Sequence, residues 1–207
     1  MLGRPRIGVA QTPKELERVF CFRYRIYVEE MRRKQRYADH AHRRIEDPLD
    51  ADGINFAAFC ADEVVGVCRV NLARDSDLGY YSAFYLMDSV GSDHPGATSI
   101  TTRLMIGPEY RTKGLAVRLA LASYKYVVPR GIRWNFIDCN DHLVRFFMGL
   151  GYVAHVPKSE HEEYGLVTRM RLEIHGLQHL ERLRSPFAAA LLSMRSAEPL
   201  EIEAAVA

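Results

Sequence analysis

The sequence predicts an α/β protein of the α+β class, in which helices flank a central mixed, mostly antiparallel sheet. Strand patterns at 54–60 and 64–72, separated by a three-residue turn, indicate an antiparallel hairpin. A further strand pattern at 99–106 leads through a glycine loop into a long apolar helix. With 207 residues, 48% of them hydrophobic, the chain can bury one good core.

The first helix is expected from residue 12 to about residue 31. Thr12, Pro13 and Glu15 form a helix-start signature, with a hydroxyl cap, a proline at the first helical position and a glutamate that reaches back. The apolar residues recur along one face, and Arg23 falls on that face. A buried guanidinium without a partner is costly, so Arg23 needs a carboxylate, phosphate or carbonyl group nearby.

Two more arginines lie inside strand patterns. Alternation with a period of two puts Arg69 on an apolar face of its strand, with a strand-edge position in solvent as the alternative. Arg103 lies in the strand at 99–106. Because arginines on apolar faces need a carboxylate, we predict that Arg23, Asp50 and Arg103 belong to one buried ionic network.

An insertion at 75–98 joins the strand patterns at 64–72 and 99–106, and it is rich in aromatic and turn residues. A tight turn is enough to join two neighbouring strands. A longer segment with a short helix can therefore wall a pocket or cover a substrate.

The loop from Arg111 to Ala116 predicts a phosphate cradle. Gly114 lets the backbone approach a ligand closely, and Ala116 keeps the next turn uncrowded. The unpaired amides at the start of the helix expected over 116–128 point at whatever anion binds there. Arg111 adds a positive charge. The alternative is a glycine that serves the strand-to-helix turn alone.

The rest of the chain continues the pattern of strands and helices. We expect a strand at 134–139, a helix at 140–150 and a final hairpin from 153–156 and 166–174. From residue 176 onward a helical appendage is expected, broken at Ser185-Pro186 and frayed over 198–207. We therefore divide the chain into a domain at 1–175 and a C-terminal helical extension at 176–207.

Composition excludes some classes of partner. Lysine and arginine number 28 against 26 acidic residues, and a formal charge of +2 does not favour nucleic acid. The stretch 18–44 is locally basic. It is interpreted either as a solvated face or as a docking surface for an acidic partner. The first ten residues lack the apolar stretch of a secretory signal, and no segment has the roughly 18 apolar residues of a membrane span. We expect a cytoplasmic protein.

The loop pattern R-x-x-G-x-A resembles the pyrophosphate loop of the GNAT acyltransferase superfamily, which holds the diphosphate of coenzyme A. The run 22–30, the pair Asp47 and Asp50, and the strand arginines Arg69 and Arg103 resemble one branch of it. That branch contains the acyl-homoserine lactone synthases and the long-chain N-acyl amino acid synthases. The similarity covers roughly residues 7–175 and implies a GNAT fold.

The resemblance also implies roles for particular residues. In those families an arginine on the first helix, acidic residues after it and arginines on two strands form a buried charge network beside the acyl donor. The matching residues with implied catalytic roles are Arg23, Asp47, Asp50, Arg69 and Arg103. The residues implied to bind the thioester, the diphosphate or the pantetheine arm are Leu104, Met105, Ile106, Arg111, Lys113, Gly114, Leu115, Ala116 and Asn140. For Asn140 a helix N-cap is the alternative role.

The chain departs from these families at three places. Ile100 stands where lactone synthases have a glutamate, and Arg32 and Arg33 stand where they have a tryptophan near the end of the first helix. Phe147 stands where many GNAT acetyltransferases have the tyrosine that protonates the leaving thiol. Tyr124 and Tyr152 are the substitutes for this acid, and the candidate general bases are Asp47, Asp50 and Asp138.

The resemblance implies an N-acyltransferase. It would move a medium or long acyl chain from an acyl carrier protein or acyl-CoA thioester to the amine of an amino acid or peptide. The alternatives are an acetyltransferase that uses acetyl-CoA on a small amine, and a non-catalytic thioester-binding module. We expect acyl-CoA or acyl-phosphopantetheine as the donor substrate, no permanently bound cofactor and no metal site.

Overall fold

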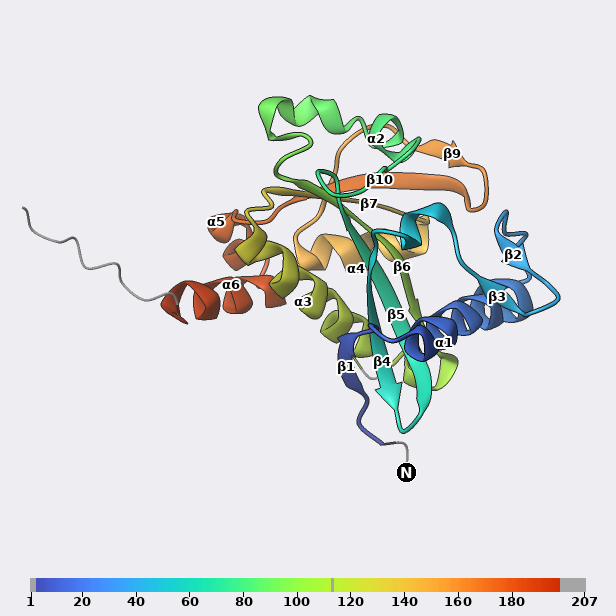
Figure 1. Ribbon diagram of the computed structural model, residues 1–207. Helices are drawn as coiled ribbons and strands as arrows, with labels where there is room; N and C mark the ends of the chain where they lie inside the picture. Colours follow the sequence, from blue (N-terminus) through green and yellow to red (C-terminus); the bar gives the residue numbers. More distant parts are fainter. Residues whose placement is uncertain (1–2, 113, 198–207) are drawn as a thin grey trace, which may run out of the picture.

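The computed structural model describes residues 3–112 and 114–197, which form an eight-stranded mixed sheet with helices on both faces (Figure 1). The order of the strands is β1-β4-β5-β6-β7-β10-β8, and β9 pairs with β10. β6 and β7 are parallel, whereas the other neighbouring strands of this sheet are antiparallel. The strands are β1 (Arg6–Val9), β4 (Ile54–Cys60), β5 (Glu63–Leu72), β6 (Thr98–Ile106), β7 (Trp134–Cys139), β8 (Val153–Ala154), β9 (Ser159–His161) and β10 (Gly165–Glu173). The mixed, mostly antiparallel sheet predicted from the sequence is confirmed.

The first helix, α1 (Pro13–Tyr24), continues into the π-helical segment η1 (Arg25–Glu30) and so ends where the sequence predicts. Its start is the predicted capping box, in which the Glu15 amide donates to the Thr12 hydroxyl at 3.2 Å. After it, the short strands β2 (Ala38–Asp39) and β3 (Arg44–Ile45) pair with each other. A single helical turn, η2 (Pro48–Asp50), leads into β4.

The two faces of the sheet carry two separate cores. Along β4, Phe56 and Ala58 point to the core under α3 (Leu115–Val127) and α4 (Asp141–Leu150). Ala57 and Phe59 point to the core under α1. This alternation follows from the two-residue period of a strand, and it explains why an apolar run fills both faces.

The predicted insertion between β5 and β6 forms the helix α2 (Tyr81–Phe84) and the helical turns η3 (Met87–Asp93). They lie at the top of Figure 1, beside the ends of β7 and β10. A third core cluster holds them there through Tyr85, Met87 and Phe136. The insertion is thus packed against the sheet.

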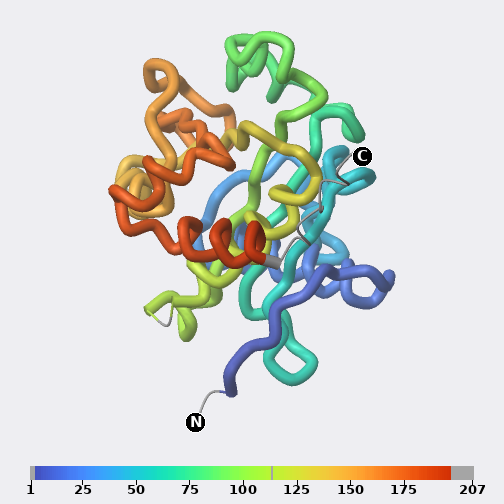
Figure 2. The backbone as a smooth tube through the Cα atoms, turned by 90° about the vertical axis from the view of Figure 1, so that its left-hand side faces the viewer, coloured from blue at the N-terminus to red at the C-terminus, as the bar shows by residue number. Residues whose placement is uncertain are grey.

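The chain closes with α5 (Leu177–Arg182) and α6 (Pro186–Ala197), separated at the predicted Ser185-Pro186 break. α6 lies along α3 (Figure 2), and its Phe187 ring stacks on Tyr124 at 4.2 Å between centroids. The predicted fraying of 198–207 lies outside the described residues, and the boundary between 175 and 176 stays a prediction. No helix in the described ranges has the length and apolar character to cross a membrane.

Candidate active site

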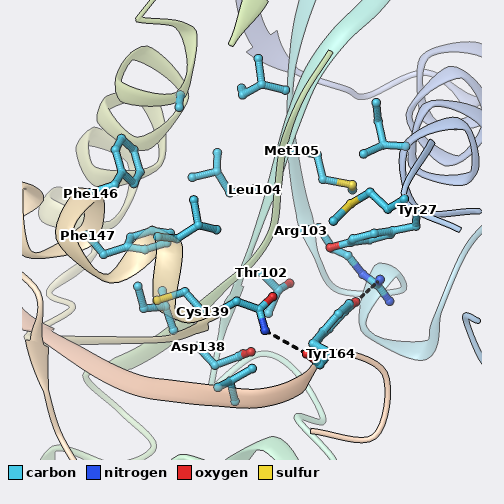
Figure 3. A pocket seen from close by; sticks show the side chains of 18 of the residues that line it. Tyr27, Thr102, Arg103, Leu104, Met105, Asp138, Cys139, Phe146, Phe147 and Tyr164 are labelled. Atoms are coloured by element: carbon cyan, nitrogen blue, oxygen red, sulfur yellow. Dashed lines mark hydrogen bonds between the residues drawn. The ribbon is translucent and has the colours of Figure 1, made fainter. Parts of the chain in front are cut away.

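A cavity of about 580 Å³ opens where β6 and β7 diverge. The two strands pair over three residues, from Thr98 with Trp134 to Ile100 with Phe136, and no further. Figure 3 shows Tyr27 and Tyr164 on one side of this cavity and Phe146 and Phe147 on the other. The predicted donor-site residues that line it are Leu104, Met105, Ile106, Arg111, Ala116 and Asn140.

A β-bulge in β6 lies at the wall of this cavity. Val67 pairs with Met105 and Arg69 with Thr102, so Arg103 and Leu104 together oppose a single residue of β5. Arg103 has a φ of +59°, in the left-handed region that a non-glycine residue rarely adopts. Such a conformation costs about 1–3 kcal/mol and persists where its surroundings hold it. Neither the bulge nor the strain leaves a signal in the sequence.

The five residues with implied catalytic roles form one chain of ion pairs behind the cavity. Arg23 contacts Asp50 at 2.7 Å, Asp50 contacts Arg69 at 2.9 Å, Arg69 contacts Asp47 at 2.6 Å, and Asp47 contacts Arg103 at 2.7 Å. This is the network predicted for Arg23, Asp50 and Arg103, with Arg69 facing inward and not in solvent. Of the five, Arg103 is the one that lines the cavity.

The turn η2 explains why both carboxylates of this network lie side by side. Asp47 accepts the Leu49 amide at 3.1 Å, and Asp50 accepts the Asp47 amide at 2.9 Å, as in a capping box. Burial alone would raise the pKa of Asp47, but the charges of Arg69 and Arg103 outweigh it and hold this pKa below the ordinary value. The pKa of Asp50 is lowered in the same way by Arg23 and Arg69, against the effect of its burial. Both groups are therefore anions at neutral pH and poor proton acceptors.

Asp138 differs from these two carboxylates. It lines the cavity, and burial raises its pKa above the ordinary value. The Tyr85 hydroxyl donates a 2.5 Å hydrogen bond to it. Of the three candidate bases, Asp138 alone combines access to the cavity with an environment that favours the protonated form.

The predicted phosphate cradle begins α3. Gly114 has a φ of +69° and open space where a Cβ would stand, and its carbonyl accepts the Arg118 amide at 3.2 Å. Leu115 is buried in the core under α3, so its amide alone is available to a ligand. The Arg111 guanidinium forms an ion pair with Glu30, which reduces the net charge that it brings to the loop. Lys113 lies outside the described residues.

Asn140 occupies the N-cap position of α4, but its side chain forms no cap hydrogen bond. It instead donates to the Tyr164 carbonyl at 2.9 Å and accepts from Arg33 at 3.1 Å. Asn140 thus takes the N-cap position of the alternative role, without a side-chain cap hydrogen bond. Asn140 joins the turn that carries Tyr164 to the cavity wall.

The proposed substitutes for the missing acid point elsewhere. The Tyr152 hydroxyl donates to the Asn135 side chain at 2.6 Å, and the Tyr124 hydroxyl donates to the Ile174 carbonyl at 2.5 Å. The tyrosines that line the cavity are Tyr27, Tyr81 and Tyr164. Tyr81 belongs to the 75–98 insertion that was expected to wall a pocket. Sequence reasoning missed Tyr164, because a tyrosine in a turn carries no periodic signal.

Cys139 also lines the cavity, and burial raises the pKa of its thiol to about 12. A protonated thiol is a weak nucleophile, which argues against an acyl-cysteine intermediate. Within residues 3–112 and 114–197, no group of three or more histidine, cysteine, aspartate or glutamate residues is placed to hold a metal ion.

A sequence model of the family described as "Acetyltransferase (GNAT) domain" matches residues 22–121. No curated protein sequence matches the chain. BjaI, a CoA-dependent acyl-homoserine lactone synthase solved with SAM and isopentyl-CoA, is 18% identical, with a TM-score of 0.67 over 88% of this chain and 90% of that chain. FeeM, an N-acyl amino acid synthase from uncultured soil microbes, is 14% identical, with a TM-score of 0.65 over 90% and 98%. Escherichia coli ElaA is 13% identical, with a TM-score of 0.59 over 82% and 99%.

Identities this low establish the fold and leave the substrate open. BjaI and FeeM represent the two kinds of synthase that the residue pattern resembles. The structural neighbours thus include members of the branch that the residue pattern resembles. The strand order, the diverging β6 and β7 and these structural matches together show that the chain has the GNAT fold, and the GNAT family model matches its residues 22–121.

Proposed function

We propose that this protein is an N-acyltransferase that moves a medium or long acyl chain from a thioester to the amine of an amino acid or peptide. The observation that carries the proposal is the cavity itself. The cavity is lined by residues of the phosphate cradle at the start of α3, by the bulge of β6 and by the buried carboxylate of Asp138. These are the parts that aminolysis of a thioester needs.

The acyl donor would enter from the α3 end. The first amides of α3 and the open backbone at Gly114 suit a diphosphate, and the gap between β6 and β7 suits the pantetheine arm. The likeness to BjaI, described as CoA-dependent, supports a coenzyme A donor.

A carrier protein is the second candidate donor. Arg32, Lys34 and Arg36 are exposed beside the cavity residue Arg33. None of these three side chains has an acidic partner within 4 Å among the described residues, and they would suit the acidic surface of an acyl carrier protein.

The size and lining of the cavity favour a chain longer than acetyl. Its volume of about 580 Å³ falls in the range of sites that hold drug-sized ligands. Leu104, Phe146, Phe147 and Val167 give it apolar walls. Such walls bind a hydrocarbon chain and contribute little to holding an acetyl group.

Asp138 is the general base in this proposal. The amine nitrogen attacks the thioester carbonyl, its proton passes to the Asp138 carboxylate, and the carbon–sulfur bond breaks as the thiolate leaves. A backbone N–H at the bulge of β6 would hold the developing oxyanion. Asp47 and Asp50 take no proton, because each is held by two arginines.

Mass spectrometry of the products tests the proposal. The purified protein is incubated with acetyl-CoA, a long-chain acyl-CoA or a long-chain acyl carrier protein, each with a pool of free amino acids. The proposal expects an N-acyl amino acid from a long-chain donor, and the productive donor distinguishes coenzyme A from carrier protein. Transfer from acetyl-CoA alone would identify an acetyltransferase, and binding without release of free thiol would identify a thioester-binding module.

Gly114→Val should weaken coenzyme A binding by about tenfold or more, equivalent to ~1.4 kcal/mol. The β-branched side chain disfavours the left-handed backbone and fills the space that the diphosphate needs. Gly131→Val is the matched control, since Gly131 has the same φ of +69° and equally open surroundings. Titration calorimetry should show weakened binding for the first variant alone. Equal affinity of both variants and the parent would make the loop structural.

A further inference from the structure

Arg103 lines the cavity, yet most of its hydrogen-bonding capacity is already used. One nitrogen of its guanidinium donates to Asp47 at 2.7 Å. The other donates to Gln35 and to the Tyr164 hydroxyl, each at 2.7 Å. The guanidinium also lies over the Tyr27 ring, at 5.3 Å from its centroid. These contacts, with Asp47 shared between Arg103 and Arg69, leave the Arg103 guanidinium little freedom to bind an anionic substrate.

These anchors come from four separate parts of the chain. Tyr27 belongs to η1, Gln35 to the segment after it, Asp47 to the cap of η2 and Tyr164 to the turn between β9 and β10. Figure 3 shows the Arg103 side chain pointing away from the apolar side of the cavity, toward Tyr27 and Tyr164. The four groups together fix the guanidinium in one place.

The backbone of the same residue is the strained point of β6. Its φ of +59° occurs within the bulge, where Arg103 and Leu104 oppose one residue of β5. Beyond Ile100 the other edge of β6 has no pairing with β7, so the bulge faces the cavity. A left-handed residue inside a strand needs support, and the anchored side chain of Arg103 supplies it.

We infer that Arg103 is a positioning residue whose anchored side chain holds the bulge of β6, so that a backbone N–H of β6 faces the thioester carbonyl. The inference rests on the proposed acyl transfer. In this view the arginine acts through its own backbone and makes no contact with the acyl donor or the amine.

Three substitutions separate this role from a direct role of the charge. Arg103→Ala and Arg103→Gly remove the same contacts, but glycine accepts a positive φ without strain and alanine does not. Arg103→Lys keeps the charge and loses the forked geometry that reaches Asp47, Gln35 and Tyr164 together. We expect kcat to fall about 100-fold in the alanine variant, a typical effect of a lost oxyanion donor. The glycine variant should retain at least about ten times the kcat of the alanine variant, and KM for the thioester should change little in both.

The infrared band of the bound thioester carbonyl provides a readout that general loss of structure would not move. In the parent and the glycine variant the band should lie at lower frequency than in water, and in the alanine variant the shift should be lost. Equal loss of kcat in the alanine and glycine variants, with recovery in the lysine variant, would overturn the inference and assign a direct role to the charge.

The inference and the proposed function can fail separately. If the parent turns over none of the acyl donors, the proposed acyl transfer is contradicted. Crystal structures of the alanine and glycine variants without any ligand then still test the bulge. The glycine variant should keep the pairing of Val67 with Met105 and of Arg69 with Thr102, and the alanine variant should lose it. An unchanged bulge in the alanine variant would overturn the inference.

Discussion

Asp47→Asn should lower the free energy of unfolding by about 3–5 kcal/mol, the typical cost of breaking a buried ion pair from one side. The variant keeps the size of the side chain and the oxygen that accepts the Leu49 amide. It removes the charge that lies between Arg69 and Arg103. Arg103 would then lose its carboxylate partner among the described residues, and Arg69 would share the carboxylate of Asp50 with Arg23.

Urea denaturation at neutral pH measures this loss. Asp62→Asn is the matched control, because Asp62 pairs with Arg18 while its own side chain is 93% exposed. The control should stay within about 0.5 kcal/mol of the parent, as exposed pairs contribute little. A loss in the Asp47 variant as small as that of the control would contradict the account of the network.

The same network predicts how stability depends on pH. The folded pKa of Asp47 lies below the unfolded value of about 3.9, so its contribution is complete above that pH and is lost as the pH falls through the folded pKa. The stability of the parent should therefore fall on acidification below about pH 4. The Asp47→Asn variant should fall less steeply over the same range, as measured by urea denaturation at a series of pH values.

Asp138→Asn should lower kcat by about 10²–10⁴-fold, the usual contribution of a general base. The asparagine keeps the shape of the side chain and cannot take the proton of the amine. Since burial raises the pKa of Asp138, the parent should lose activity as the pH falls through that pKa. The variant should lack this acidic limb. An unchanged kcat in the variant would show that a group other than Asp138 is the general base.

Tyr85→Phe is the companion test. The Tyr85 hydroxyl donates to Asp138 at 2.5 Å and, against the larger effect of burial, helps to lower the pKa of this carboxyl. Its removal should move the acidic limb to higher pH while activity at high pH is kept. If activity falls over the same acidic pH range in the variant as in the parent, this fall is due to the titration of a group other than Asp138.

The sequence predicts those parts of the fold that local rules determine. The capping box at Thr12, the hairpin of β4 and β5 and the break before α6 follow from short residue patterns. The ionic network was predictable for a different reason. An arginine on an apolar helix face needs a carboxylate, and the resemblance to the synthase families pointed to Asp47 and Asp50 as the acidic residues.

Other features depend on contacts between distant segments and give no local signal. β1 is a four-residue edge strand that β4 holds in place, and the sequence analysis missed it. Arg111 meets Glu30 of η1, which changes the charge expected at the cradle. Tyr164 reaches the cavity because the turn before β10 folds over it. Such positions are set by tertiary packing, which one sequence does not reveal.

A crystal structure with a non-hydrolysable long-chain acyl-CoA thioether tests the central claim most directly, namely that the cavity between β6 and β7 holds the acyl donor. The account predicts the diphosphate at the amides that follow Gly114, the thioether sulfur between the diverging strands and the alkyl chain against Leu104 and Phe147. A ligand bound elsewhere, with this cavity empty, would contradict the claim.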